Sequence, residues 1–285
     1  MKGLYKLLFI VLPVALIGAC TGENSQTKEA YLLQEAADSA QFGIGKVKKV
    51  IYSFPSPHEV TLLLTEQAGA KFSESFLFPL NRIDAYITSG DKAFLLGVLS
   101  TDMNFAGLYK QNQTSLNYLD AVVRISDNLG VNEPIADSLL RKLEKGMINK
   151  EDMLKLFSEN YMTLENFLKE NERGEQVAIL LAGGWIEGLY LAIKIAEQSD
   201  TVNEKLAERI AGQSISMNSL LSYCEDYRNT PYVNKMHGDL VKLNEKFIEL
   251  NKISSDDNLH KTSAYNELTK AIEKFRNSFL EISQN

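Results

Sequence analysis

Signals that begin and end α-helices recur along most of the chain, and they constrain the fold more than any other feature. Ser56, Pro57 and Glu59 form a capping box with proline at the first helical position. Residues 88–91 form a second capping box, and Gly130 is suited to the position that follows the last turn of a helix. Glycine and proline are scarce, at 17 and 6 of 285 residues, so little interrupts the helices between these signals.

The pattern predicts an all-α fold, an irregular multi-helix bundle. Its helices should be mostly antiparallel, because the loops between successive helices are short. We find neither a strand pattern nor the fixed-length repeat of a helical solenoid. The expected helices lie at residues 28–41, 47–54, 56–68, 92–109, 113–129, 134–145, 149–171, 175–198, 202–228, 231–251 and 261–282.

The first twenty residues have the features of a secretory signal: two lysines, an apolar run at 7–17 and then small residues. Their end, Ile17-Gly18-Ala19-Cys20, resembles the lipobox of bacterial lipoproteins. The resemblance implies a signal peptide at 1–19 that is cleaved before Cys20, and acyl chains on Cys20. Two or more acyl chains anchor a protein stably to a membrane. An uncleaved anchor helix and a signal without lipid remain the alternatives.

Residues 20–27 then read as a tether, and 28–285 as a single helical domain. The expected location is the cell envelope, at the outer membrane and facing the periplasm or the cell surface. The outer leaflet of a cytoplasmic membrane is the alternative. Thr21 follows the anchor, where an aspartate would favour the inner membrane. The chain carries a net charge of −7, and −9 from Cys20 onward, because 28 Lys and Arg face 37 Asp and Glu. An acidic body disfavours nucleic acid as a partner.

Residues 177–196 are apolar and long enough to span a bilayer, and they contain Gly184 and Gly188 at a spacing that allows close helix packing. Glu187, however, would then lie at the bilayer centre, where a carboxylate is costly. We therefore interpret this segment as the central buried helix of the bundle.

Asp102 and Glu187 lie in the two most apolar predicted helices, where an unpaired carboxylate is costly. In one interpretation they converge on a cavity and serve ligand binding or acid–base chemistry. In the other, which we prefer, each pairs with a partner for structural reasons, and Gly183 and Gly184 allow close helix packing. The expected partners are Arg82, Arg124 or Lys194 for Asp102, and Lys194 or a tyrosine hydroxyl for Glu187.

Residues 68–82 form an irregular segment that is unusually aromatic. We expect it to be a hydrophobic lid over the core, although such loops can also shape a site. Residues 52–57 (Tyr-Ser-Phe-Pro-Ser-Pro) and 97–103 (Gly-Val-Leu-Ser-Thr-Asp-Met) resemble segments of an uncharacterised family of helical envelope lipoproteins. The resemblance spans about residues 50–130, implies no activity, and adds Tyr52 to the residues of interest.

The sequence contains no zinc-binding, nucleophile-elbow, P-loop or dinucleotide-binding motif, so we expect no cofactor or metal and assign no catalytic residue. The expected function is that of a lipid-anchored envelope protein that binds a protein or a small molecule, or acts as a scaffold. The alternative is an envelope hydrolase that uses Asp102 and Glu187. The candidate ligand-binding residues are Asp102, Glu187, Tyr52, Tyr109, Trp185 and Lys194.

Overall fold

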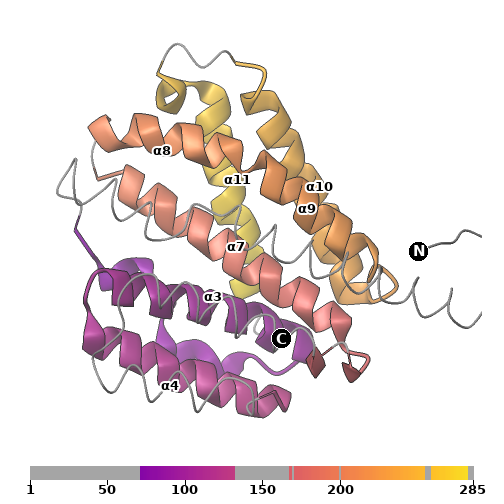
Figure 1. Cartoon of the computed structure of the whole chain (residues 1–285). Helices are drawn as coiled ribbons and strands as arrows, with labels where there is room; N and C mark the ends of the chain where they lie inside the picture. The colour runs from indigo at the N-terminus through magenta and orange to yellow at the C-terminus, as the bar shows by residue number, and fades with distance from the viewer. Residues whose placement is uncertain (1–70, 132–166, 169, 199, 254–257, 282–285) are drawn as a thin grey trace, which may run out of the picture. The chain divides into compact units, whose positions relative to one another are not determined.

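Helices form the regular structure of the protein, as the computed structural model in Figure 1 shows. The structure describes residues 71–131, 167–168, 170–198, 200–253 and 258–281. These residues contain seven α-helices, three short 3-10 helices and no β-strand. The predicted all-α, multi-helix fold is therefore confirmed.

The described elements all belong to one compact unit, Phe42–Asn285. The predicted signal peptide, the tether, the domain start at residue 28, the helices at 28–41, 47–54, 56–68 and 134–145, and most of 149–171 lie outside the described residues. In chain order the elements are η1 (Glu74–Phe76), η2 (Leu80–Ala85), α3 (Ser89–Leu108), α4 (Asn112–Leu129), α7 (Gly174–Ala196), α8 (Asp200–Gly212), α9 (Ser214–Glu225), α10 (Pro231–Leu250), η3 (Leu259–Lys261) and α11 (Ser263–Leu280).

Five predicted helices agree with α3, α4, α7, α10 and α11 to within a few residues, but the single helix predicted at 202–228 is wrong. The chain forms two helices there, α8 and α9. Gly212, a poor helix former, ends α8, and the N–H of Gln213 bonds to the carbonyl of Ile210 (3.0 Å) in the tighter 3-10 pattern. The carbonyl of Gln213 then accepts the first bond of α9, from Met217 (2.9 Å).

Neighbouring helices are mostly antiparallel, as predicted. Between α9 and α10, Asn218 bonds to Asn244 (3.4 Å) while Glu225, later in α9, pairs with His237, earlier in α10 (3.1 Å). Helices α3 and α7, which are not consecutive, are an exception and run in the same direction. This is a consequence of long-range packing rather than of a short loop.

Helix α7 lies at the centre of the described residues. It contacts α3 on one side, and α8, α9, α10 and α11 on the other. It is the one helix among the described residues that is long and apolar enough to cross a membrane, yet most of it is buried inside the protein. This placement agrees with the interpretation of residues 177–196 as a core helix.

Glycines allow α3 and α7 to approach closely. A Cβ atom on Gly97 would lie 2.6 Å from the backbone nitrogen of Gly184, and one on Gly183 would overlap the carbonyl oxygen of Phe94. The hydroxyl of Thr101 also donates to the carbonyl of Gly184 (3.2 Å). Gly97 and Gly183 therefore serve helix packing, because backbone occupies the space beside them. For Gly183 this agrees with the preferred interpretation of the sequence.

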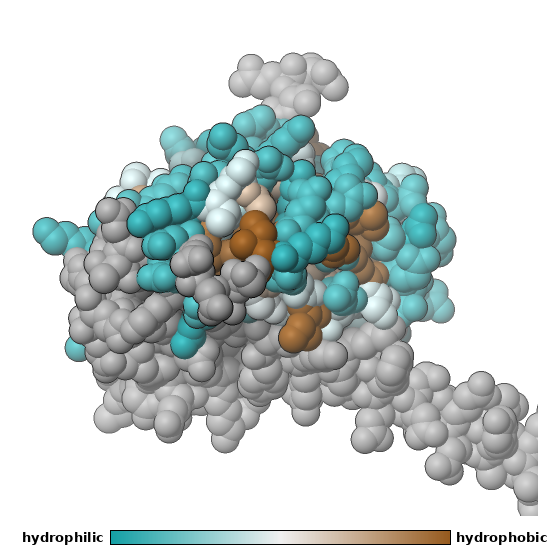
Figure 2. Space-filling view, turned by 90° about the horizontal axis from the view of Figure 1, so that it is seen from above, coloured by the Kyte–Doolittle hydropathy of each residue, from teal (hydrophilic) through white to brown (hydrophobic). Residues whose placement is uncertain are grey.

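The described surface in the view of Figure 2 is mostly hydrophilic, and the hydrophobic side chains on it form separate spots between hydrophilic ones. Large hydrophobic residues that are exposed among the described residues are few: Ile87, Ile215, Val241, Ile248 and Ile253.

Thr88 caps α3 as predicted, and its removal should cost measurable stability. Its Oγ1 accepts a hydrogen bond from the N–H of Asp91 (3.1 Å) and donates one to Oδ2 of the same residue (2.6 Å). We expect Thr88→Ala to lower the free energy of unfolding by about 1 kcal/mol in chemical denaturation. Thr230 precedes α10 but makes no side-chain cap bond, so Thr230→Ala should lower the free energy of unfolding by less. Equal decreases for the two variants would contradict the capping assignment.

Candidate functional site

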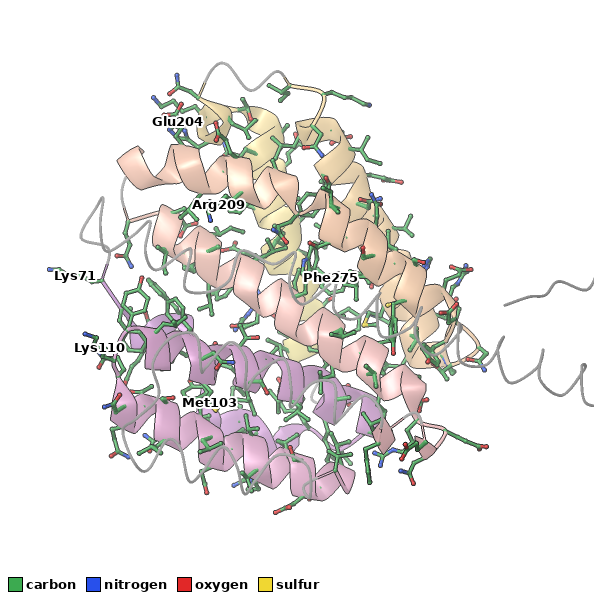
Figure 3. All side chains as sticks on the ribbon, viewed as in Figure 1. Lys71, Met103, Lys110, Glu204, Arg209 and Phe275 are labelled. Atoms are coloured by element: carbon green, nitrogen blue, oxygen red, sulfur yellow. The ribbon has the colours of Figure 1, made fainter. Side chains whose placement is uncertain are left out.

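Asp102 and Glu187 come together in the core. Asp102 lies in the middle of α3 and Glu187 in the middle of α7, and neither is exposed to solvent (0%). The two carboxyl groups lie close enough for each to shift the pKa of the other. The position of Asp102 along α3 can be found in Figure 3 from the label of Met103, the next residue in the sequence. The two carboxyl groups therefore lie side by side, as one interpretation of the sequence expected, but they are buried in the core rather than exposed to solvent.

Arg276 on α11 holds Glu187 through two hydrogen bonds. Its Nε donates to Oε2 of Glu187 (2.5 Å) and its Nη2 donates to Oε1 (2.8 Å). The guanidinium also stacks over the ring of Tyr190, 4.0 Å from the centroid. Two parallel bonds of this kind give the geometry in which a guanidinium binds a carboxylate most strongly. Each oxygen of Glu187 thus accepts one hydrogen bond from Arg276 and keeps a second lone pair.

The predicted partners of Glu187 are wrong. Lys194 lies two turns further along α7, nearer the surface, where its Nζ pairs with Glu273 of α11 (2.5 Å) and with Glu197 (3.1 Å). Arg276, one turn after Glu273 on α11, reaches Glu187 instead. The two helices are therefore joined by two ion pairs, one buried and one near the surface.

Asp102 has a backbone partner rather than the cation that we predicted. Its Oδ2 accepts a hydrogen bond from the N–H of Phe78 (2.9 Å). Its Oδ1 is buried and accepts no hydrogen bond from the described residues. The predicted cations are engaged elsewhere: Arg82 donates to the carbonyl of Leu280 (3.0 Å), Arg124 pairs with Asp84, and Lys194 pairs with Glu273.

The described part of the aromatic segment covers the core, as predicted for a lid. Leu77 and Phe78 are buried in it, between η1 and η2. Phe78 fixes the lid from both ends of its backbone: its N–H donates to Asp102, and its carbonyl accepts from the hydroxyl of Tyr118 on α4 (2.6 Å). The lid is therefore joined both to α3 and to α4.

Burial sets the protonation of the carboxyl pair. Burial raises the pKa of Asp102 well above its usual value, and the charge of Glu187 raises that pKa further. The N–H of Phe78 and the charge of Arg276 lower the pKa of Asp102, but by less. Burial also raises the pKa of Glu187, and Arg276 opposes that rise.

The structure does not bring the other candidate residues into this cluster. The ring of Tyr109 packs against Phe105, with centroids 4.9 Å apart, at the end of α3. Trp185 packs against Phe247 of α10, with centroids 6.0 Å apart, on a different side of α7 from Glu187. Tyr52 and the predicted lipidation site, Cys20, lie outside the described residues.

Sequence reasoning missed Arg276 and the backbone of Phe78. Arg276 did leave a signal, because it continues the apolar face of α11 one turn after Ile272 and beside Phe279. A charged residue on a buried face indicates a buried partner of opposite charge. The N–H of Phe78 left no such signal, since any residue except proline carries one.

Among the described residues no group of three or more His, Cys, Asp or Glu side chains could hold a metal ion. Comparison with protein-family models, with curated proteins and with solved structures found no match to the chain. The site joins α3, α7, α11 and the lid through one buried cluster of Asp102, Glu187 and Arg276.

Proposed function

We propose that the protein is a lipid-anchored component of the bacterial cell envelope that acts as a binding or scaffolding module. The observation that carries the proposal is the lipobox-like end of the signal, Ile17-Gly18-Ala19-Cys20, ahead of a helical body. The proposed location is the outer membrane, facing the periplasm or the cell surface, and the proposed partner is a protein or a small molecule. The resemblance to helical envelope lipoproteins at residues 52–57 and 97–103 supports the same assignment.

The alternative, a hydrolase that uses Asp102 and Glu187, receives less support. A catalytic acid or base must reach the substrate, and both carboxyl groups are buried at 0% exposure. The two oxygens of Glu187 are also engaged by Arg276. We therefore place ligand recognition on the surface of the protein rather than at this cluster.

Removing the proposed lipidation site should release the protein from membranes. In cells fed a labelled fatty acid, we expect the full chain to take up label and to sediment with membranes. Cys20→Ser should do neither, because the acyl chains require the thiol of Cys20. The matched control is Cys224→Ala, which removes the buried thiol in α9 and should keep both label and membrane association.

Two outcomes would contradict the anchor: an intact mass without lipid on Cys20 in the wild type, or fatty-acid label that persists in Cys20→Ser. The binding role needs a separate test. A pull-down from native membranes with the anchor retained should recover the same partner with wild type and with Thr230→Ala, a control at a half-buried residue. Turnover of an envelope polymer that depends on Asp102 would instead favour the hydrolase.

A further inference from the structure

The carboxyl pair contains an oxygen that no group donates to. Oδ1 of Asp102 is buried, has no hydrogen-bond partner among the described residues, and belongs to the carboxyl group that lies beside that of Glu187. Two carboxylates cannot hydrogen-bond to each other without a proton, since each has only acceptor oxygens when ionised. A buried oxygen left in this way is costly unless it carries a proton that it can donate.

Glu187 cannot easily be the group that carries the proton. Its two oxygens already accept from Nε and Nη2 of Arg276 at 2.5 and 2.8 Å, a geometry that requires the ionised form. Asp102 accepts one backbone N–H on Oδ2 and has Oδ1 left over. The proton therefore belongs on Asp102.

We propose that Asp102 is a neutral carboxylic acid in the folded protein, that its proton bridges to Glu187, and that this stored proton makes the fold sensitive to pH. The cluster of Asp102, Glu187 and Arg276 then has no net charge: one neutral acid, one carboxylate and one guanidinium. This inference does not depend on the function proposed above.

Each element packed against the cluster contributes groups that face it. The charges of these groups are consistent with a cluster of no net charge. Arg276 supplies the one positive charge, and the phenol of Tyr118 stays neutral because burial raises its pKa. Lys194 is engaged by two other carboxylates. The facing groups are Glu187 and Tyr190 on α7, Arg276 on α11, Tyr118 on α4 and the N–H of Phe78 in the lid.

The sign of the pH dependence follows from the site of the proton. In the unfolded chain an aspartate ionises near pH ~3.9, whereas folded Asp102 keeps its proton to higher pH. Above that value unfolding releases a proton, so the contribution of Asp102 to stability is fully present at or below about pH 4 and is lost as the pH rises toward the raised pKa. An aspartate paired with a cation would show the opposite trend.

Asp102→Asn tests the proposal, because an amide keeps the shape and the donor but cannot ionise. Above about pH 5, and until the pH reaches the raised pKa of Asp102, the equilibrium constant for unfolding of the full-length wild type should rise about tenfold per pH unit relative to that of Asp102→Asn. This corresponds to about 1.4 kcal/mol per unit. Asparagine at this position should thus make the protein more stable at neutral pH than the native residue does, as measured by urea denaturation.

Asp239→Asn is the matched control. Despite partial burial, hydrogen bonds from Lys242 and Lys235 lower the pKa of Asp239, so this residue is ionised in both states over the same range. The difference in free energy of unfolding between Asp239→Asn and the wild type should not change with pH. If the difference for Asp102→Asn did not change with pH either, the proposal would be overturned.

A measurement on the wild type covers the case in which Asp102→Asn fails to fold. In the protein labelled with ¹³C at aspartate carboxyl carbons, one signal should stay at the position of a protonated acid after the other aspartate signals have moved to the ionised position. Aspartate signals that have all moved to the ionised position by about pH 6 would overturn the proposal.

Discussion

Replacing Arg276 with methionine should lower the free energy of unfolding by about 3–5 kcal/mol, because it leaves Glu187 buried without its cation. Glu187 is not exposed to solvent and receives two hydrogen bonds from the guanidinium. Its neighbour is another acid, Asp102, which cannot replace the lost charge. Chemical denaturation at neutral pH measures the effect.

The matched control is Arg124→Met, which removes a cation from a pair on the surface. Arg124 and its partner Asp84 are both largely exposed, with side-chain exposures of 48% and 87%. Water screens such pairs, so the loss should be less than about 1 kcal/mol. Similar losses for Arg276→Met and Arg124→Met would mean that Arg276 is not buried against Glu187.

Gly183→Ala should lower the free energy of unfolding by about 2–3 kcal/mol, although alanine is the better helix former. The new Cβ would overlap the carbonyl oxygen of Phe94 on α3. Backbone cannot rotate away as a side chain can, so α3 and α7 would have to move apart. That movement would also stretch the contact between Asp102 and Glu187.

Gly238→Ala is the comparison for this effect. Gly238 lies inside α10, and no neighbouring atom comes within 4 Å of the place where its Cβ would lie. Alanine should therefore stabilise the protein by about 0.5–1 kcal/mol. Thermal denaturation of both variants should give shifts of opposite sign. A neutral or stabilising Gly183→Ala would contradict the close packing of α3 on α7.

Local signals in the sequence were sufficient to predict most of the described helices. Thr88 and Gly130 mark a start and an end that the structure confirms: Thr88 caps α3, and Gly130 follows α4 with a left-handed φ of 67°. The break at Gln213 was missed because the apolar pattern continues through it. A single turn of tighter helix changes the direction of the chain without changing that pattern.

The candidate site was predictable only in part. The apolar helices around Asp102 and Glu187 were enough to predict that both residues are buried. The cation that reaches them could not be predicted, because Arg276 is 89 residues away from Glu187 and the packing of α11 on α7 decides the pairing. Lys194 was the nearer choice in sequence, but Glu273 on the same face of α11 binds it instead.

The central claim is that Asp102, Glu187 and Arg276 form one structural cluster in the helical core. The double variant Glu187→Gln/Arg276→Met tests it most directly, because it removes both charges and keeps the packing. We predict a free energy of unfolding close to that of the wild type, and well above that of Arg276→Met alone, since a buried ion pair can be replaced by neutral groups at little cost. A double variant whose loss equals the sum of the two single losses would show that the two residues do not interact, and would contradict the account.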